Sequence, residues 1–108
     1  MMSTTQVATT VDSQEAAEAI ARSAVEARLA ACAQVSGPIT SVYRWQGAVE
    51  TAQEWAVTFK TTAERYPALE THVRQMHPYE LPEIVAVPLG GSEAYLDWVR
   101  VEVGQPAG

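Results

Sequence analysis

The sequence predicts an α+β fold in a single domain, and three observations lead to that prediction. Segments typical of strands and helices follow one another in the order strand, helix, strand, strand, helix, strand, helix. The chain has 108 residues, the length of one ordinary domain, and 47% of them are hydrophobic, as in a globular protein. The second and third strands are long and adjacent, so the sheet should carry an extended β-hairpin.

The first strand and the first helix are predicted from the N-terminal part of the chain. Val7 to Val11 is short and rich in β-branched residues, which favours a strand. Asp12 and Ser13 then offer a side-chain cap for a helix. This helix is expected to run to about Ala31, because small apolar residues recur along it at helical spacing: Ala17, Ile20, Ala21 and Ala24.

Residues 33–45 and 49–61 are predicted to form the two strands of the hairpin. Apolar and polar residues alternate in both segments, and Gln46-Gly47 between them is a turn signal. Gly37-Pro38 interrupts the first segment, where we expect a bulge or a bend. The alternation assigns one set of side chains to a common face of the first hairpin strand: Ala33, Val35, Ile39, Tyr43 and Trp45.

The second helix follows the hairpin. Thr62 offers a side-chain oxygen as its N-cap, while Pro67, which is tolerated close to a helix start, allows a start slightly later. The apolar stripe of this helix recurs at steps of three and four residues: Tyr66, Leu69, Val73 and Met76.

The segment from His77 to Glu83, here called the proline loop, has the sequence His-Pro-Tyr-Glu-Leu-Pro-Glu. Proline fixes its own φ and restricts the residue before it, so this loop should hold its polar side chains in defined places. A plain structural turn is the alternative interpretation. A strand over residues 83–88 follows, and then a helix capped by Ser92 that runs to about Val103.

This order of elements is that of the ferredoxin-like, split βαβ sandwich, here with an extended hairpin and a C-terminal helix. We expect one domain over residues 6–103 and flexible termini at 1–5 and 104–108. The hairpin is longer than a four-stranded sheet of this size needs, and the chain is rich in tryptophan and tyrosine. Both features favour an interface with other copies of the chain.

Charge and composition exclude several classes of function. The net charge of −6 leaves no basic surface for a phosphate backbone, so nucleic acid is not an expected partner. No apolar run is long enough for a membrane span, and the N-terminus has no signal-peptide pattern, so no membrane partner is expected. With Cys32 as the single cysteine, no internal disulfide can form, and a cytoplasmic location is expected.

Five motifs follow one another over nearly the whole chain. In chain order they are Glu26-Ala27-Arg28-Leu29-Ala30-Ala31-Cys32-Ala33, Tyr43-Arg44-Trp45-Gln46-Gly47, Lys60-Thr61-Thr62, His77 to Ile84, and Tyr95-Leu96-Asp97-Trp98. Together they resemble the divalent-cation tolerance protein family, CutA. The resemblance implies a ferredoxin-like fold and a homotrimer similar to the PII signalling proteins, with hairpins that join between subunits. It also implies a role in the response to metal ions and the binding of copper or another divalent cation.

Two residues are candidate metal ligands, His77 and Cys32. In the family pattern that the sequence resembles, copper is held by a first-strand cysteine and two adjacent histidines. Those positions fall at about Thr9 and at Met76-His77 here, so one of the three ligands is present. A hydroxyl is a poor ligand for Cu(II), and methionine suits Cu(I), so Cu(II) binding should be weak. His77 could instead fix the loop through a backbone carbonyl, and Cys32 could be a small buried apolar residue.

A ligand pocket is the other candidate site. The family resemblance places seven of the motif residues, listed below, at clefts between subunits. They include aromatic residues, a lysine and an acid, and a cleft with such a lining suits a small molecule. Interface packing is the alternative, in which the trimer is a structural or interaction module or a PII-like signalling protein without a metal. No motif for a nucleophile, a phosphate loop or paired carboxylates is present, so no enzyme is expected. The predicted pocket residues are Tyr43, Trp45, Lys60, His77, Tyr79, Glu83 and Trp98.

Overall fold

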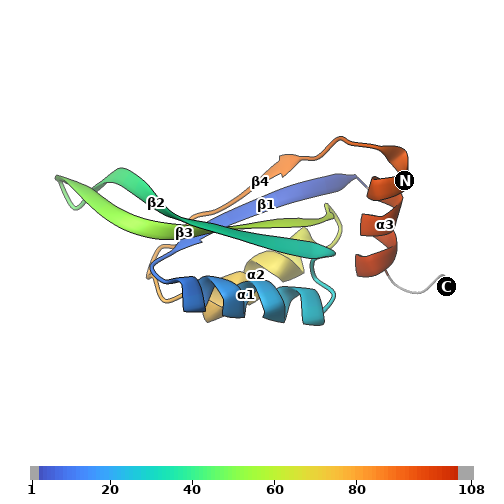
Figure 1. Ribbon diagram of the computed structural model, residues 1–108, viewed down its shortest axis with the longest axis horizontal. Coiled ribbons are helices and arrows are strands. Elements are labelled where there is room, and N and C mark those ends of the chain that lie inside the picture. The colour runs from blue at the N-terminus through green and yellow to red at the C-terminus, as the bar shows by residue number, and fades with distance from the viewer. Residues whose placement is uncertain (1–2, 105–108) are drawn as a thin grey trace.

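The computed structural model describes residues 3–104 and has the predicted α+β fold (Figure 1). Its strands form one antiparallel sheet in the order β2-β3-β1-β4. Because β3 and β4 both run antiparallel to β1, they point the same way, as a split βαβ arrangement requires. The elements are β1 (Thr4–Val11), α1 (Gln14–Glu26), β2 (Cys32–Trp45), β3 (Ala48–Thr62), α2 (Tyr66–Met76), β4 (Ile84–Pro88) and α3 (Glu93–Val103).

Helices α1 and α2 cover one face of the sheet, and the core lies between them and the strands (Figure 1). The alanine-rich stripe of α1 allows the helix to approach the sheet closely, while Leu69 and Val73 of α2 fill the space beside it. Phe59 is the largest fully buried side chain. The other face of the sheet carries no helix, and Val85 and Val87 of the edge strand β4 are exposed on it.

Strand β1 begins at Thr4, three residues before the predicted start. Thr4 pairs with Thr62, and its hydroxyl donates a hydrogen bond of 2.6 Å to the carbonyl of Leu89. Thr4 and Thr5, which belong to the segment 1–5 expected to be flexible, are paired and buried in the structure. The other residues expected to be flexible are 1–3 and 104–108. Of these, the structure describes Ser3 and Gly104, and residues 1–2 and 105–108 lie outside the described residues.

Helix α1 ends at Glu26, five residues before the predicted end, because Arg28 takes a left-handed conformation with φ of 60°. The amide of Leu29 donates to the carbonyl of Ala24, and the amide of Arg28 donates to that of Val25. This pair of bonds is a Schellman motif, which glycine usually provides. The absence of a glycine hides this helix end in the sequence.

The predicted irregularity at Gly37-Pro38 is confirmed. It divides β2 into two parts with opposite facing, so the predicted common face of five side chains is wrong. Ser36 pairs with Ala56 and Ile39 with Glu54, so β2 advances three residues while β3 advances two. This one-residue bulge reverses the alternation of side chains. Consequently Ala33 and Val35 face the helices, while the other three members of the predicted common face lie on the opposite side of the ladder: Ile39, Tyr43 and Trp45.

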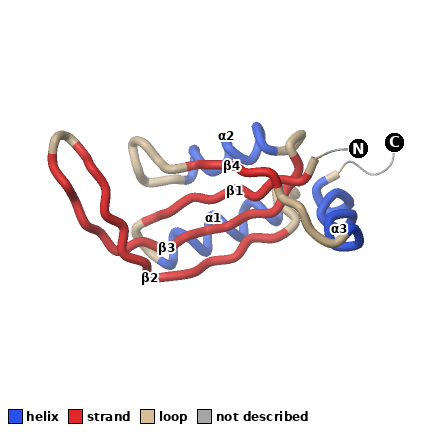
Figure 2. The backbone as a smooth tube through the Cα atoms, turned by 90° about the horizontal axis from the view of Figure 1, so that it is seen from above, coloured by secondary structure: helices blue, strands red, loops and turns tan. Residues whose placement is uncertain are grey.

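The predicted turn at Gln46-Gly47 is confirmed. Both residues have positive φ, as a two-residue turn between twisted strands requires, and Trp45 pairs directly with Ala48. The hairpin projects beyond the rest of the sheet, and the molecule measures 50 × 23 × 21 Å. Figure 2 shows the hairpin tip and the loop between α2 and β4 at the same end of the molecule, with α3 at the opposite end.

The α2 helix begins at Tyr66, so the later of the two starts allowed by Pro67 is the observed one. Thr62 does not cap the helix itself. Its hydroxyl accepts a hydrogen bond from the amide of Arg65 and so closes the turn that precedes the helix.

Two arginines fix α3 at the end of the sheet. The Arg28 Nε donates to the carbonyl of Glu102 at 2.9 Å, and the Arg65 Nε donates to the carbonyl of Val103 at 2.6 Å. These bonds satisfy carbonyls that the last turn of a helix leaves without partners. Between residues 3 and 104, none of the helices is long and apolar enough to cross a membrane.

Candidate functional site

The proline loop is fixed from within by His77. This side chain is buried, its Nε2 lies 2.8 Å from the carbonyl oxygen of Thr10, and its Nδ1 lies 3.2 Å from the amide nitrogen of Tyr79. The amide can only donate and the carbonyl can only accept, so the ring is the neutral tautomer with its proton on Nε2. Both ring nitrogens are thereby engaged with the backbone.

Tyr79 connects the proline loop to the sheet. Its ring meets that of His77 edge to face, with 4.7 Å between the ring centroids. Its hydroxyl donates a hydrogen bond of 2.7 Å to Oε2 of Glu54 on β3. Burial raises the pKa of Tyr79, and the hydrogen bond and the charge of Glu54 raise it further. Tyr79 is therefore a neutral donor throughout the physiological pH range.

Glu54 was not among the sequence-predicted site residues. It pairs with Ile39 at the first position after the bulge, and only 7% of its surface is exposed. The donor that the described residues supply to this carboxylate is a neutral tyrosine hydroxyl, which is unusual because charged groups are seldom buried without a cation. The sequence offered one signal for Glu54, an acidic residue within a segment predicted to be a strand. That signal does not reveal its partner, because Tyr79 lies 25 positions away along the chain.

A groove of about 620 Å³ lies between the proline loop and the hairpin. The hairpin contributes one wall, the proline loop contributes the other, and the end of β1 contributes Thr10. Four of the seven predicted pocket residues line it: Tyr43, Trp45, Tyr79 and Glu83. The other lining residues are Thr10, Ser41, Val42, Glu54, Glu80 and Leu81.

Three predicted pocket residues do not line this groove within one chain. His77 lies beneath Tyr79 and fixes the loop. Lys60 pairs with Gln6 near the other end of β1, where its Nζ donates to Oε1 of Gln34 at 2.8 Å. Trp98 is on α3, packed against Tyr95. Lys60 and the proline loop therefore lie at opposite ends of the sheet.

The two candidate metal ligands are also far apart along the sheet. Cys32 pairs with Lys60 and lies 3.4 Å from the hydroxyl of Tyr95, whereas His77 contacts the carbonyl of Thr10 near the other end of β1. The hydrogen bond with Cys32 raises the pKa of Tyr95. Across residues 3–104, no three His, Cys, Asp or Glu side chains converge as a metal site would require.

The two departures from the family copper pattern occupy different environments. Thr9 is completely buried on the face of β1 that carries Val7 and Val11, and its hydroxyl has no hydrogen-bond partner among the described residues. Met76 is exposed at the last position of α2. The residues of one chain therefore do not fit a copper centre of the cysteine and histidine type.

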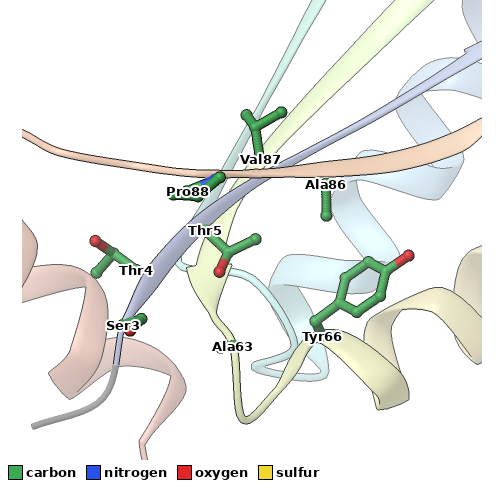
Figure 3. A pocket seen from close by; sticks show the side chains of 8 residues that line it. All are labelled: Ser3, Thr4, Thr5, Ala63, Tyr66, Ala86, Val87 and Pro88. Atoms are coloured by element: carbon green, nitrogen blue, oxygen red, sulfur yellow. The ribbon is translucent and has the colours of Figure 1, made fainter.

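A second cavity of about 330 Å³ lies at the other end of β1 (Figure 3). Its wall is formed by residues 3–5 at the start of β1, by residues 86–88 of β4, and by Ala63 and Tyr66 before and at the start of α2. Apart from Tyr66, these side chains are small or apolar. Burial raises the pKa of Tyr66, with a further contribution from Glu70. None of the described residues that line this cavity is charged, so the groove beside the proline loop is the better candidate site.

Comparison with known proteins agrees with the fold described above. Residues 5–102 match the family described as CutA1 divalent ion tolerance protein. The chain is 48% identical over 96 residues to the divalent-cation tolerance protein CutA of Thermus thermophilus, which covers 88% of this chain and 93% of the relative. It is 44% identical over 92 residues to the human protein named CutA, covering 84% of this chain and 51% of the human protein.

Solved structures have the same fold. The divalent cation tolerance protein Cut A1 from Thermus thermophilus superposes with a TM-score of 0.91 at 46% identity, covering 94% of this chain and 99% of that one. The structure titled periplasmic divalent cation tolerance protein CutA, from Archaeoglobus fulgidus, superposes with a TM-score of 0.89 at 36% identity, with the same coverage of 94% and 99%.

Proposed function

The chain belongs to the CutA1 divalent ion tolerance protein family, and we propose that it acts in the response to divalent metal ions as a homotrimeric binding protein without enzymatic activity. Its binding site is the groove beside the proline loop, which takes a divalent cation or a small ligand. The observation that carries this proposal is the buried Glu54 carboxylate, which lines a groove and has a neutral tyrosine as its partner.

The free sheet edges and the open face support the homotrimer. Strand β4 is short and apolar, and Val85 and Val87 are exposed on the face that no helix covers. The hairpin presents further exposed apolar side chains, among them Val42 and Val49. Such edges and patches are expected to be paired or covered by another chain. In the trimer, a neighbouring chain would bring its own Lys60 and Trp98 toward the groove, while His77 would support the proline loop from beneath.

The donor atoms in the groove favour a hard cation over copper. Glu54, Glu80 and Glu83 supply carboxylate oxygens, which suit Mg²⁺ or Mn²⁺, whereas thiolate and imidazole ligands suit copper. His77 has both ring nitrogens engaged, and Cys32 lies elsewhere. Since three ligands do not converge among residues 3–104 of one chain, a metal ion in the groove would take further oxygen donors from a neighbouring chain or from water.

The proposed location is the cytoplasm, on the basis of the single free cysteine. The name of the archaeal relative places that protein in the periplasm. Fractionation of cells that express the full-length protein decides between the two compartments, and recovery in a periplasmic fraction would refute the proposed location.

Light scattering and calorimetric titration of the purified protein test this function. We expect a mass of three chains and binding of Mn(II) that is lost in Glu54→Gln but retained in Glu64→Gln. The second variant is the control because it also removes one carboxylate, from an exposed residue in the turn before α2. Cu(II) should bind weakly, and Thr9→Cys with Met76→His should strengthen it. A mass of one chain would refute the trimer, and Mn(II) binding unaffected by Glu54→Gln would refute the site.

A further inference from the structure

We propose that the natural ligand of the groove includes a protonated amine on an alkyl stem, held by Glu54 and enclosed by aromatic rings. This inference rests on the groove assigned above and names the class of ligand that it takes. The size of the groove, the charges that line it and the chemistry of its walls all support this ligand class.

The groove is much larger than a metal ion needs. Its volume of about 620 Å³ lies within the range of small-molecule sites, whereas a cation with its ligands occupies a far smaller space. A molecule with a stem of several carbon atoms would use the length of this space.

The charges lining the groove are all negative. Three glutamates contribute carboxylates, and the described residues of one chain add no lysine, arginine or histidine to the lining. Glu54 is the strongest candidate to bind a cation, because it is buried and the hydrogen bond from Tyr79 uses one of its two oxygens. A carboxylate can accept about four hydrogen bonds, so Glu54 retains capacity for a charged donor in the groove. A cation there would compensate a charge for which residues 3–104 of one chain supply no counter-ion, and the Lys60 of a neighbouring chain is the competitor that Lys60→Ala removes.

The walls distinguish an organic cation from a metal ion. Tyr43 and Trp45 from the hairpin and Tyr79 from the proline loop supply aromatic rings, whose faces attract cations and pack against alkyl groups. Aromatic rings of this kind are not metal ligands, and the hydroxyl of Tyr79 already donates to Glu54. An ammonium group is preferred over a quaternary one, because only the former can donate to the free oxygen of Glu54.

Titration calorimetry of the assembled protein tests the inference, with 1,4-diaminobutane as probe and 1-butanol and tetramethylammonium as comparators. We expect binding of the diamine that weakens as salt is added, weaker binding of tetramethylammonium, and none of the alcohol. Glu54→Gln should weaken diamine binding about tenfold or more, since a charged hydrogen bond is lost. Trp45→Leu, at a partly exposed position that the core does not need, should also weaken it, while Glu64→Gln should not.

Several outcomes would overturn the inference. Absence of diamine binding to the folded protein would do so, as would equal affinities of the parent protein and Glu54→Gln. Binding that emerges only in Lys60→Ala would show that a lysine of a neighbouring chain already occupies the site. Mn(II) titration and light scattering on the same samples separate these results from failure of the proposed function: a trimer that binds Mn(II) but no amine refutes the inference alone.

Discussion

Replacing Tyr79 with phenylalanine removes one hydroxyl and tests whether the proline loop is held by Glu54. The bond between the two is 2.7 Å long, and its acceptor is a carboxylate with 7% of its surface exposed. A hydrogen bond to a charged group contributes about 1.5–3 kcal/mol to the free energy of unfolding. Because Glu54 lines a groove that admits water, we expect a loss near the lower end, about 1.5–2 kcal/mol.

The loss should depend on pH in a defined direction. Burial and Glu54 raise the pKa of Tyr79 in the folded protein above its value of about 10 in the unfolded chain. The stabilisation by the neutral hydroxyl is therefore fully present below about pH 10 and declines as the pH rises toward the folded-state pKa. The difference in unfolding free energy between the parent protein and Tyr79→Phe should be constant from pH 7 to 9 and should narrow above about pH 10.

Urea unfolding followed by circular dichroism measures this difference, at one fixed chain concentration because oligomers are stabilised by mass action. Tyr43→Phe is the matched control, since Tyr43 lines the same groove and its hydroxyl has no hydrogen bond among the described residues. That control should change stability by less than about 0.5 kcal/mol. Equal losses in the two variants, or a difference that widens at alkaline pH, would refute the role assigned to the Tyr79 hydroxyl.

Three further substitutions test the fold. Phe59→Ala should lower the unfolding free energy by about 3–5 kcal/mol, as measured by urea unfolding, and an unchanged unfolding free energy would contradict its place in the core. Gly37→Ala should lower the unfolding free energy by about 1–3 kcal/mol, because the φ of Gly37 is +150° and the added Cβ would lie 2.7 Å from Cδ1 of Trp55. Unchanged thermal stability of this variant would contradict the bulge geometry. Ser13→Ala should reduce the unfolding free energy by about 1 kcal/mol, since its hydroxyl oxygen accepts from the amide of Ala16; rescue by Asn and not by Val identifies the cap.

Much of the fold could be predicted from local patterns. Ser13, one of the two residues that offered a cap for the first helix, caps it, Ser92 caps α3 as expected, and the turn at Gln46-Gly47 closes the predicted hairpin. Such features depend on a few neighbouring residues, so the sequence specifies them directly. The helix end at Arg28 was missed because its left-handed conformation is stabilised by bonds to distant carbonyls of α3, which compensate for the missing glycine.

Local signals specify the order of the elements, the antiparallel hairpin and the proline loop, because periodicity, turn residues and proline geometry act over short distances along the chain. Which side chains meet depends instead on contacts that form when the whole chain folds. One extra residue in β2 moved Tyr43 and Trp45 to the other side of the ladder, and the loop brought Tyr79 onto Glu54. Register and the packing of the loop on the sheet are long-range properties, so the acidic, aromatic groove existed only after the chain had folded.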